Sequence, residues 1–357
     1  MLTILYSFNK HGFEAEYWRR EIGAASGESY RFVPFNHGPF LEPALYSRAQ
    51  LLDNLYYASH PRLERLYREF EGLVHATRAD AVVVDNYPPY HPDYLRRLPI
   101  YKVLRIADGP LSAYDRDIPY AHAYDHVLYH SPAYSRDMGM AEKLAYCGVR
   151  RADFWPLALF TAACDPTQSE ERLFTRERDI DVVFIGALHV NKMPLLAALK
   201  KTFGRRCVLR GLTSLKKNVY FNARYGFPAW VRPVPFEAYV PLYQRAKIGV
   251  NVHNRGKYTV GNYRLFELPG NGVLQLSDGG EYLGSFFDVG NEIVGYATAD
   301  ELIDLIRYYL EHDDERLRIA RNGYRRVLQD HRIARRLEEA ACHIARGIKS
   351  AGERVDS

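Results

Sequence analysis

The sequence predicts an α/β protein with two doubly wound, Rossmann-like domains. A chain of 357 residues is long for one hydrophobic core and suits two domains of about 150 to 200 residues each. Short apolar segments alternate with segments of helical spacing, which is typical of repeated β-α-β units. This alternation is interrupted once, over the polar residues 165–178, and then starts again. We expect those residues to be a linker.

The first half opens with an expected strand over residues 2–8, a loop over 9–12 and a helix over about 13–22. Apolar residues between Leu63 and Val74 then recur at helical spacing. The run from Asp80 to Val84 is continuously apolar after its first residue, as in a parallel strand buried on both faces. The remaining strands are expected over 30–35, 101–106 and 126–129.

The second half repeats this pattern and ends in amphipathic helices. Its strands are expected over 181–185, 207–210, 247–252 and 273–278, and its helices over about 191–203, 236–246, 300–311, 313–330 and 333–348. We therefore expect an N-terminal domain over 1–165 and a second domain over 166–330. Residues 331–357 are expected to form a helix that crosses back to the first domain, followed by a disordered tail.

Composition excludes several classes of protein. An apolar content of 47% and a charged content of 25% are ordinary for a globular protein. No apolar run is long enough to span a bilayer, and residues 1–8 are too short and uncharged for a signal peptide. The four cysteines, at positions 147, 164, 207 and 342, form no Cys-x-x-Cys pair. This argues against a zinc site or a disulfide framework and favours a cytoplasmic location.

Charge is distributed unevenly along the chain. Residues 1–165 hold 18 basic and 20 acidic residues, a net of −2, and the remainder holds 30 and 23, a net of +7. Between Val182 and Phe236 there are ten basic residues and no acid. Such a run is usually a solvated face, but it can also attract an anionic ligand, a membrane surface or nucleic acid.

The segment 260–278 combines a short expected helix with a glycine-rich turn and a buried strand. Arg264 and Glu267 are three residues apart, so on a helix they share a face. Pro269-Gly270 is expected to end this helix, and the glycines allow a close approach of the backbone to a ligand. A helix N-terminus, an Arg and a Glu together suit a ligand with phosphates at one end and ribose hydroxyls at the other. The alternative is a surface ion pair above an ordinary turn.

A second candidate segment runs from Gly186 to Lys192, in the first strand-to-helix turn of the second half. Glycine permits a close approach there, and a lysine near the helix start can bind a phosphate. The segment is neither a Gly-x-Gly-x-x-Gly fingerprint nor a Walker loop, which disfavours a dinucleotide or an ATP-hydrolysing site. We expect the turn with Arg264 and Glu267 to reach the same end of the same sheet.

Several stretches carry a family resemblance. They are Gly261-Asn-Tyr-Arg-Leu-Phe-Glu267, Gly272-Val-Leu-Gln-Leu-Ser-Asp278, Arg316-Leu-Arg-Ile-Ala-Arg-Asn-Gly323 and His331. Together they make the region from 181 to about 336 resemble the nucleotide-binding half of GT-B glycosyltransferases. The resemblance is greatest to the spore-maturation (CgeB-like) branch, which is related to group 1, or family 4, transferases. The first half matches only in its alternation of elements.

The resemblance implies a GT-B fold, with two Rossmann-like domains facing each other across a cleft. It implies transfer of a sugar from a nucleotide diphosphate sugar, by family frequency a UDP-sugar, to a hydroxyl acceptor. No metal and no cofactor other than this donor are implied.

The resemblance also implies roles for individual residues. Glu267 matches the second Glu of the family's Glu-x7-Glu motif, which holds the ribose, whereas the first Glu falls on Val260. That departure leaves the contact with the donor sugar and the stereochemical outcome open. Lys192 is placed like the diphosphate-binding lysine of the family. The implied nucleotide-sugar site comprises Gly186, Lys192, Asn262, Tyr263, Arg264 and Glu267.

The acceptor side is expected in the first half. His11 follows the first strand, and a neutral imidazole suits a base that takes the proton of an acceptor hydroxyl in an inverting transfer. Asp108 lies just past another strand and can orient His11, act as the base or hold a sugar hydroxyl. Asp85, Asn86 and Tyr87 are expected to contact the acceptor. The alternative for His11 and for Asp108 is a polar loop residue without chemistry.

Three alternatives to a transferase of this kind remain open. A nucleotide-sugar epimerase would keep the donor site but require carboxylates at the sugar. A non-catalytic subunit that binds carbohydrate or nucleotide fits the missing Glu at position 260. A transferase that modifies DNA fits the basic run over 182–236. The acceptor class (glycan, lipid-linked, protein or nucleic acid) and peripheral association with anionic surfaces are likewise open. The Asp115-Arg-Asp117 pattern is expected to be a surface loop, not a metal site.

Overall fold

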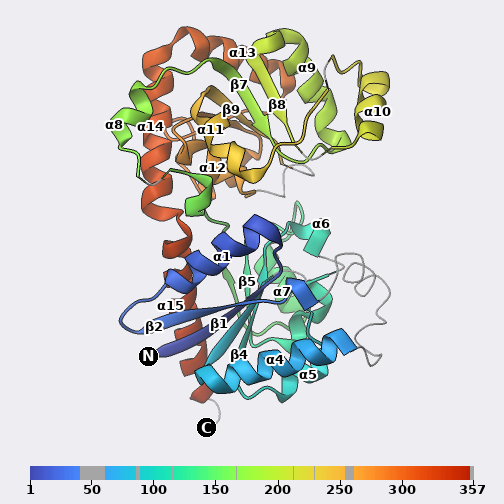
Figure 1. Cartoon of the computed structure of the whole chain (residues 1–357), viewed down its shortest axis with the longest axis vertical. Coiled ribbons are helices and arrows are strands. Elements are labelled where there is room, and N and C mark those ends of the chain that lie inside the picture. The colour runs from blue at the N-terminus through green and yellow to red at the C-terminus, as the bar shows by residue number, and fades with distance from the viewer. Residues whose placement is uncertain are drawn as a thin grey trace. The chain divides into compact units, whose positions relative to one another are not determined.

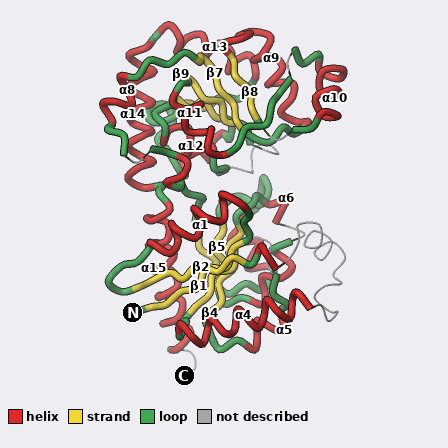
Figure 2. Tube along the Cα trace, viewed as in Figure 1, coloured by secondary structure: helices red, strands yellow, loops and turns green. Residues whose placement is uncertain are grey.

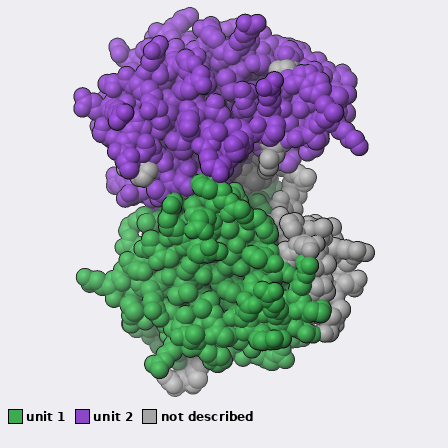
Figure 3. All heavy atoms as spheres, in the orientation of Figure 1, with its two compact units in different colours: residues 1–156, 333–357 green, residues 157–332 purple. Residues whose placement is uncertain are grey.

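The computed structural model of the chain describes residues 1–40, 61–85, 89–113, 116–165, 167–211, 213–228, 230–253 and 261–353 (Figure 1). The chain divides into two compact units (Figure 3). Unit 1 comprises Met1–Pro156 and Ile333–Ser357, and unit 2 comprises Leu157–Arg332. Each unit is built around a parallel sheet with helices packed against it (Figure 2). The predicted class of two parallel-sheet α/β domains is confirmed.

Unit 1 contains a six-stranded sheet of order β2-β1-β3-β4-β5-β6, in which all strand pairs are parallel. Its strands are β1 (Leu2–Phe8), β2 (Tyr30–Asn36), β3 (Ala81–Asp85), β4 (Tyr101–Ile106), β5 (His126–Tyr129) and β6 (Ala152–Phe154). Leu5 lies opposite Val33 on one side and Val82 on the other. The strand order reverses between β1 and β3, and doubly wound sheets bind ligands at the carboxyl ends of the strands beside such a reversal.

The helices of unit 1 pack according to the alternation of side chains along its strands. Leu5 packs into the same apolar cluster as Leu66 and Phe70 of α4, whereas the Tyr6 and Phe8 rings contact Trp18 of α1. On α15, the Arg336 carbonyl accepts a 2.6 Å hydrogen bond from the Trp155 indole, which fastens this C-terminal helix to unit 1. The helices are α1 (Gly12–Ala24), α4 (Pro61–Thr77), α5 (Pro92–Arg97), α6 (Pro110–Ala113), α7 (Met140–Tyr146) and α15 (Ile333–Gly352).

Unit 2 contains a five-stranded parallel sheet of order β11-β10-β9-β7-β8. Its strands are β7 (Ile180–Ile185), β8 (Cys207–Arg210), β9 (Ala246–Asn251), β10 (Leu274–Ser277) and β11 (Val294–Gly295). The strand order reverses between β7 and β9. The helices are α8 (Glu170–Thr175), α9 (Met193–Phe203), α10 (Leu215–Tyr225), α11 (Tyr239–Gln244), α12 (Arg264–Gly270), α13 (Ala299–Glu311) and α14 (Asp313–Asp330).

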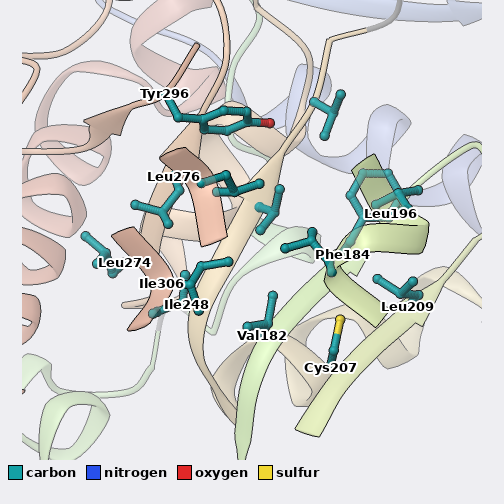
Figure 4. Packing of buried hydrophobic residues seen from close by; sticks show 14 of the residues in the cluster. Val182, Phe184, Leu196, Cys207, Leu209, Ile248, Leu274, Leu276, Tyr296 and Ile306 are labelled. Atoms are coloured by element: carbon teal, nitrogen blue, oxygen red, sulfur yellow. The ribbon is translucent and has the colours of Figure 1, made fainter. Parts of the chain in front are cut away.

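The core of unit 2 lies between its sheet and the apolar faces of its amphipathic helices (Figure 4). Val182, Phe184 and Ile248 project from the strands and meet Leu196 of α9 and Ile306 of α13. All five side chains are fully buried. Their burial fixes the strand ends, and therefore the positions of the polar residues that follow them.

Two local differences from the sequence-based expectations have clear physical reasons. Residues 170–175, expected as linker, form α8, because Leu173 and Phe174 are buried in the core of unit 2. Two apolar residues are too few to give a detectable helical period in the sequence. The helix α12 continues through Pro269 instead of ending before it. A proline in the penultimate position of a short helix removes only one backbone hydrogen bond.

None of the helices within the described ranges is both long and apolar enough to cross a lipid bilayer.

Two helical glycines give a matched test of this packing. At Gly323 in α14, a methyl group would lie 2.3 Å from the backbone oxygen of Glu292, whereas at Gly72 in α4 it would meet no atom within 4 Å. We expect Gly323→Ala to lower the free energy of unfolding by about 1–3 kcal/mol, because backbone must move. Gly72→Ala should raise it by about 0.5–1 kcal/mol. Urea unfolding measures both values, and equal effects of the two substitutions would contradict the packing.

Candidate functional site

The guanidinium of Arg264 connects β7, β9 and α12 at the point where the strand order of unit 2 reverses. Its Nε donates to the Ile185 carbonyl at 2.6 Å, and its Nη1 donates to Asn251 Oδ1 at 3.0 Å. The guanidinium also lies over the Phe184 ring, 4.4 Å from the ring centre. Although Arg264 is only 8% exposed, it forms no ion pair with any residue that the structure describes.

Gly186 follows β7 directly beneath this guanidinium. A Cβ atom at position 186 would lie 1.8 Å from Nη2 of Arg264. The sequence predicted that a glycine here allows a close approach of the backbone. In unit 2 the group that approaches is the Arg264 side chain, so the absence of a side chain at Gly186 leaves the space that the guanidinium occupies.

Lys192 is the second buried cation at this edge of the sheet. It ends the 3₁₀ turn Val190–Lys192, just before α9, and only 3% of it is exposed. Within the described ranges its side-chain ammonium group has no hydrogen bond and no ion pair, whereas its backbone N–H donates to the His189 carbonyl at 3.0 Å. Burial, and then the charge of Arg264, lower the pKa of Lys192 to about 7, while Asp278 acts in the opposite direction. A desolvated ammonium group without a counter-charge is costly, so the site is suited to an anion.

The buried His253 and the half-buried Asp278 form a pair beside these cations, which was not predicted from the sequence. The backbone N–H of His253 donates to Asp278 Oδ1 at 2.9 Å, and its Nδ1 lies 2.6 Å from the same oxygen. The Nε2 atom accepts a 3.2 Å hydrogen bond from the Gly261 N–H. The ring is therefore assigned the tautomer with its proton on Nδ1. It holds the backbone that leads into α12.

Glu267 and Asn262 are both held by side chains of other segments. Glu267 is 8% exposed, and its Oε2 accepts a 3.0 Å hydrogen bond from the fully buried Tyr243 hydroxyl. Asn262 donates to Asn251 Oδ1 at 2.9 Å and accepts from the Leu265 N–H at 3.0 Å. The two hydrogen bonds of Asn262 fix the start of α12. Tyr263 is half-buried, and its ring centre lies 6.2 Å from that of Phe160.

In unit 1, the predicted residues follow β1, β3 and β4. His11 is exposed at the N-cap of α1. Asp108 forms an ion pair with Arg116. Asp85 is 5% exposed and pairs with Arg105 Nη1 at 2.9 Å. Burial raises the pKa of Asp85, and the charge of Arg105 opposes this effect. The predicted residues Asn86 and Tyr87, and Val260 of the motif, lie outside the described residues.

A buried polar cluster at this edge of unit 1 was not predicted. Ser7 Oγ lies 2.9 Å from His37 Nδ1 and 2.7 Å from the Tyr90 hydroxyl. Burial, and then the charge of His11, lower the pKa of His37 to about 3, so its imidazole is neutral at pH 7. The only signal in the sequence was a single serine within the apolar strand 2–8.

The sequence and the structure were compared with known proteins. Residues 192–341 match a family described as "Glycosyl transferase-like". No curated protein sequence matches the chain significantly.

Three solved structures share the fold over almost their entire length. Sucrose-phosphate synthase from Thermosynechococcus elongatus has a TM-score of 0.66 at 13% identity, covering 98% of this chain and 100% of that one. A glycosyltransferase from Rickettsia africae has a TM-score of 0.62 at 10% identity, covering 98% and 99%. Anabaena Alr3699/HepE in complex with UDP-glucose has a TM-score of 0.60 at 14% identity, covering 98% and 100%.

The fold is therefore the GT-B fold implied by the resemblance, and residues 192–341 of it match a glycosyl transferase-like sequence family.

The buried ammonium of Lys192 should make the stability of the unliganded protein depend on pH. Below pH 7 the lysine is protonated in both the folded and the unfolded chain, so its burial penalty is complete. Between pH 7 and about 10.5 only the unfolded chain retains the proton, and the free energy of unfolding rises with pH. Lys192→Met removes this contribution. We therefore expect the free energy of unfolding of Lys192→Met, minus that of the wild type, to be larger at pH 6 than at pH 9 by about 2 kcal/mol.

Urea unfolding of both proteins at the two pH values measures this difference, and other titrating groups cancel in the comparison. Lys201→Met, at an exposed position of α9, is the matched control and should show no such pH dependence. A pH-independent difference for Lys192→Met would contradict the burial of an unpaired ammonium.

Proposed function

We propose that this protein transfers a sugar from a UDP-sugar to a hydroxyl acceptor, without a metal ion. The observation that carries the proposal is the pair of buried cations, Lys192 and Arg264, which form no ion pair with the described residues of unit 2. A diphosphate bound between them would supply the missing negative charge. The same cations would stabilise the charge that develops on the diphosphate leaving group during transfer.

The rest of the donor site supports a nucleoside diphosphate. The carboxylate of Glu267 lies on the helix that carries Arg264, and Tyr243 holds it in place. A carboxylate held in this way suits the two hydroxyls of a ribose. HepE has been crystallised with UDP and with UDP-glucose on a related fold, which favours uridine as the base. Membership of the spore-maturation branch stays a prediction.

The acceptor side of the proposal rests on unit 1. His11 follows β1 and Asp108 follows β4, so both lie at the carboxyl edge of that sheet. We propose that His11 takes the proton of the acceptor hydroxyl and that Asp108 supports it or binds the sugar. Asp85 is engaged with Arg105, so we propose that it positions this edge, while Asn86 and Tyr87 stay proposed acceptor contacts.

Two substitutions should separate recognition of the phosphates from recognition of the ribose. Lys192→Met should weaken UDP binding by about tenfold or more and leave uridine binding unchanged, because only the diphosphate needs the cation. Glu267→Gln should weaken UDP by about tenfold and 2′-deoxy-UDP by less, because one ribose hydroxyl is already absent. Calorimetric titration of the three ligands measures this pattern. Equal losses for uridine and UDP in Lys192→Met would contradict the assignment of the phosphate site.

Activity is tested with a panel of nucleotide sugars, by measuring the release of nucleoside diphosphate with and without candidate acceptors. We expect UDP release from a UDP-sugar, and a fall in kcat of about 10²-fold or more in His11→Ala. Asp108→Ala should be impaired as well, although it retains donor binding. Tight UDP binding with no release from any donor would instead identify a non-catalytic binding subunit. Full activity in both variants would refute the acceptor-side assignment.

A further inference from the structure

Helix α10 of unit 2 turns an apolar face outward. The helix packs against α9 (Figure 1), with Asn218 and Phe221 on its buried side. Away from that side Leu215 is 72% exposed, Val219 53% and Tyr220 48%. Leu215 and Val219 are four residues apart and therefore lie on one strip of the helix.

Trp230 lies beside the same helix. The side chain of Asn218 on α10 accepts a 3.0 Å hydrogen bond from the Val231 N–H and donates a 3.2 Å bond to the Val231 carbonyl. These bonds fasten the segment next to Trp230 against the helix, and Trp230 is 53% exposed. We call Leu215, Val219, Tyr220 and Trp230, with the basic residues of α10, the α10 surface.

Exposed large apolar side chains are concentrated on the α10 surface. The described residues include ten exposed large apolar side chains, and four of them lie in the α10 surface. Single exposed apolar side chains are normal on a protein, whereas contiguous ones mark an interaction site. A surface that only contacts water needs no apolar strip flanked by an exposed tryptophan.

The charges of the α10 surface have one sign. Lys216, Lys217 and Arg224 are exposed on the same helix, and none of them forms an ion pair with a described residue. The chain has no acid between Val182 and Phe236. The basic run noted in the sequence therefore contains a helix whose exposed side chains combine these cations with the apolar strip.

We infer that the α10 surface binds an anionic lipid membrane. Apolar side chains and a tryptophan enter the interfacial region of a bilayer, while lysine and arginine reach the anionic headgroups. Nucleic acid would use the same cations, because its backbone attracts basic residues, but it gives no role to exposed Leu215 and Val219. This inference does not depend on the proposed sugar transfer.

The three tryptophans make the test direct. Trp18 and Trp155 are each 1% exposed and Trp230 is 53% exposed, so a change in emission upon membrane binding reports chiefly on Trp230. The full-length protein is mixed with vesicles of phosphatidylcholine alone or with 30% phosphatidylglycerol. We expect co-sedimentation and a blue shift of tryptophan emission only with the anionic vesicles. Trp230→Phe should lose the blue shift.

Two variants separate the apolar and the electrostatic parts of binding. Val219→Asp and the double variant Lys216→Glu/Lys217→Glu should each reduce the partition coefficient by about tenfold or more. Val289→Asp is the matched control, because Val289 is also a valine of unit 2 and is 43% exposed. It adds the same charge elsewhere and should bind vesicles like the wild type.

Each remaining outcome overturns the inference. Failure of the wild type to bind anionic vesicles, or equal losses in Val219→Asp and Val289→Asp, would refute the α10 surface as the membrane site. Salt-sensitive binding to duplex DNA that is lost in the lysine double variant and kept in Val219→Asp, without vesicle binding, would assign the surface to nucleic acid. Circular dichroism and urea unfolding of each variant establish that it is folded.

Discussion

The position of the buried Arg264 guanidinium determines how residues are arranged at the carboxyl edge of the sheet in unit 2. Arg264 reaches from α12 to the last carbonyl of β7 and to Asn251 at the end of β9. This reach requires Gly186, since a side chain there would occupy the position of Nη2. It also requires the start of α12 to stay fixed, which the bonds from Asn262 to Asn251 and from Gly261 to His253 provide. The proposed binding residues are therefore linked through one arginine rather than independently placed.

The same arrangement lowers the stability of the unliganded protein and favours the binding of an anionic ligand. Lys192 is buried, and the nearby charge of Arg264 adds to the effect of burial in lowering the pKa of Lys192. In the unliganded protein this proximity only destabilises, because no carboxylate of the described residues pairs with either cation. A dianion bound between the two cations would attract both of them, offset their repulsion and raise the pKa of Lys192. Sites of this kind reduce the stability of the free protein so that ligand binding is strong.

The sequence predicted the residues whose environment is set locally. Gly186 and Lys192 follow an apolar strand, and Arg264 and Glu267 share one short helix, so spacing alone placed them at the end of a sheet. Tyr243 and Asp278 lie 24 and 25 residues from the side chains they bind, Glu267 and His253. Ser7 is 30 residues from His37 and 83 from Tyr90. Those contacts depend on which strands are neighbours, and no local pattern in the chain encodes that.

The two units have the same topology at their strand reversals, so topology alone does not decide which of them takes the anionic donor. At the carboxyl edge of unit 1 the cations are paired with acids: Arg105 with Asp85, Arg116 with Asp108 and Lys10 with Glu14. At the corresponding edge of unit 2, Lys192 and Arg264 have no such partner among the described residues. A diphosphate at unit 1 would have to compete with carboxylates already in place, whereas at unit 2 it would meet uncompensated positive charge. Electrostatics therefore supports the proposal that the donor binds unit 2 and that an uncharged acceptor binds the edge of unit 1, where the hydroxyls of Ser7 and Tyr90 and the neutral imidazole of His37 lie.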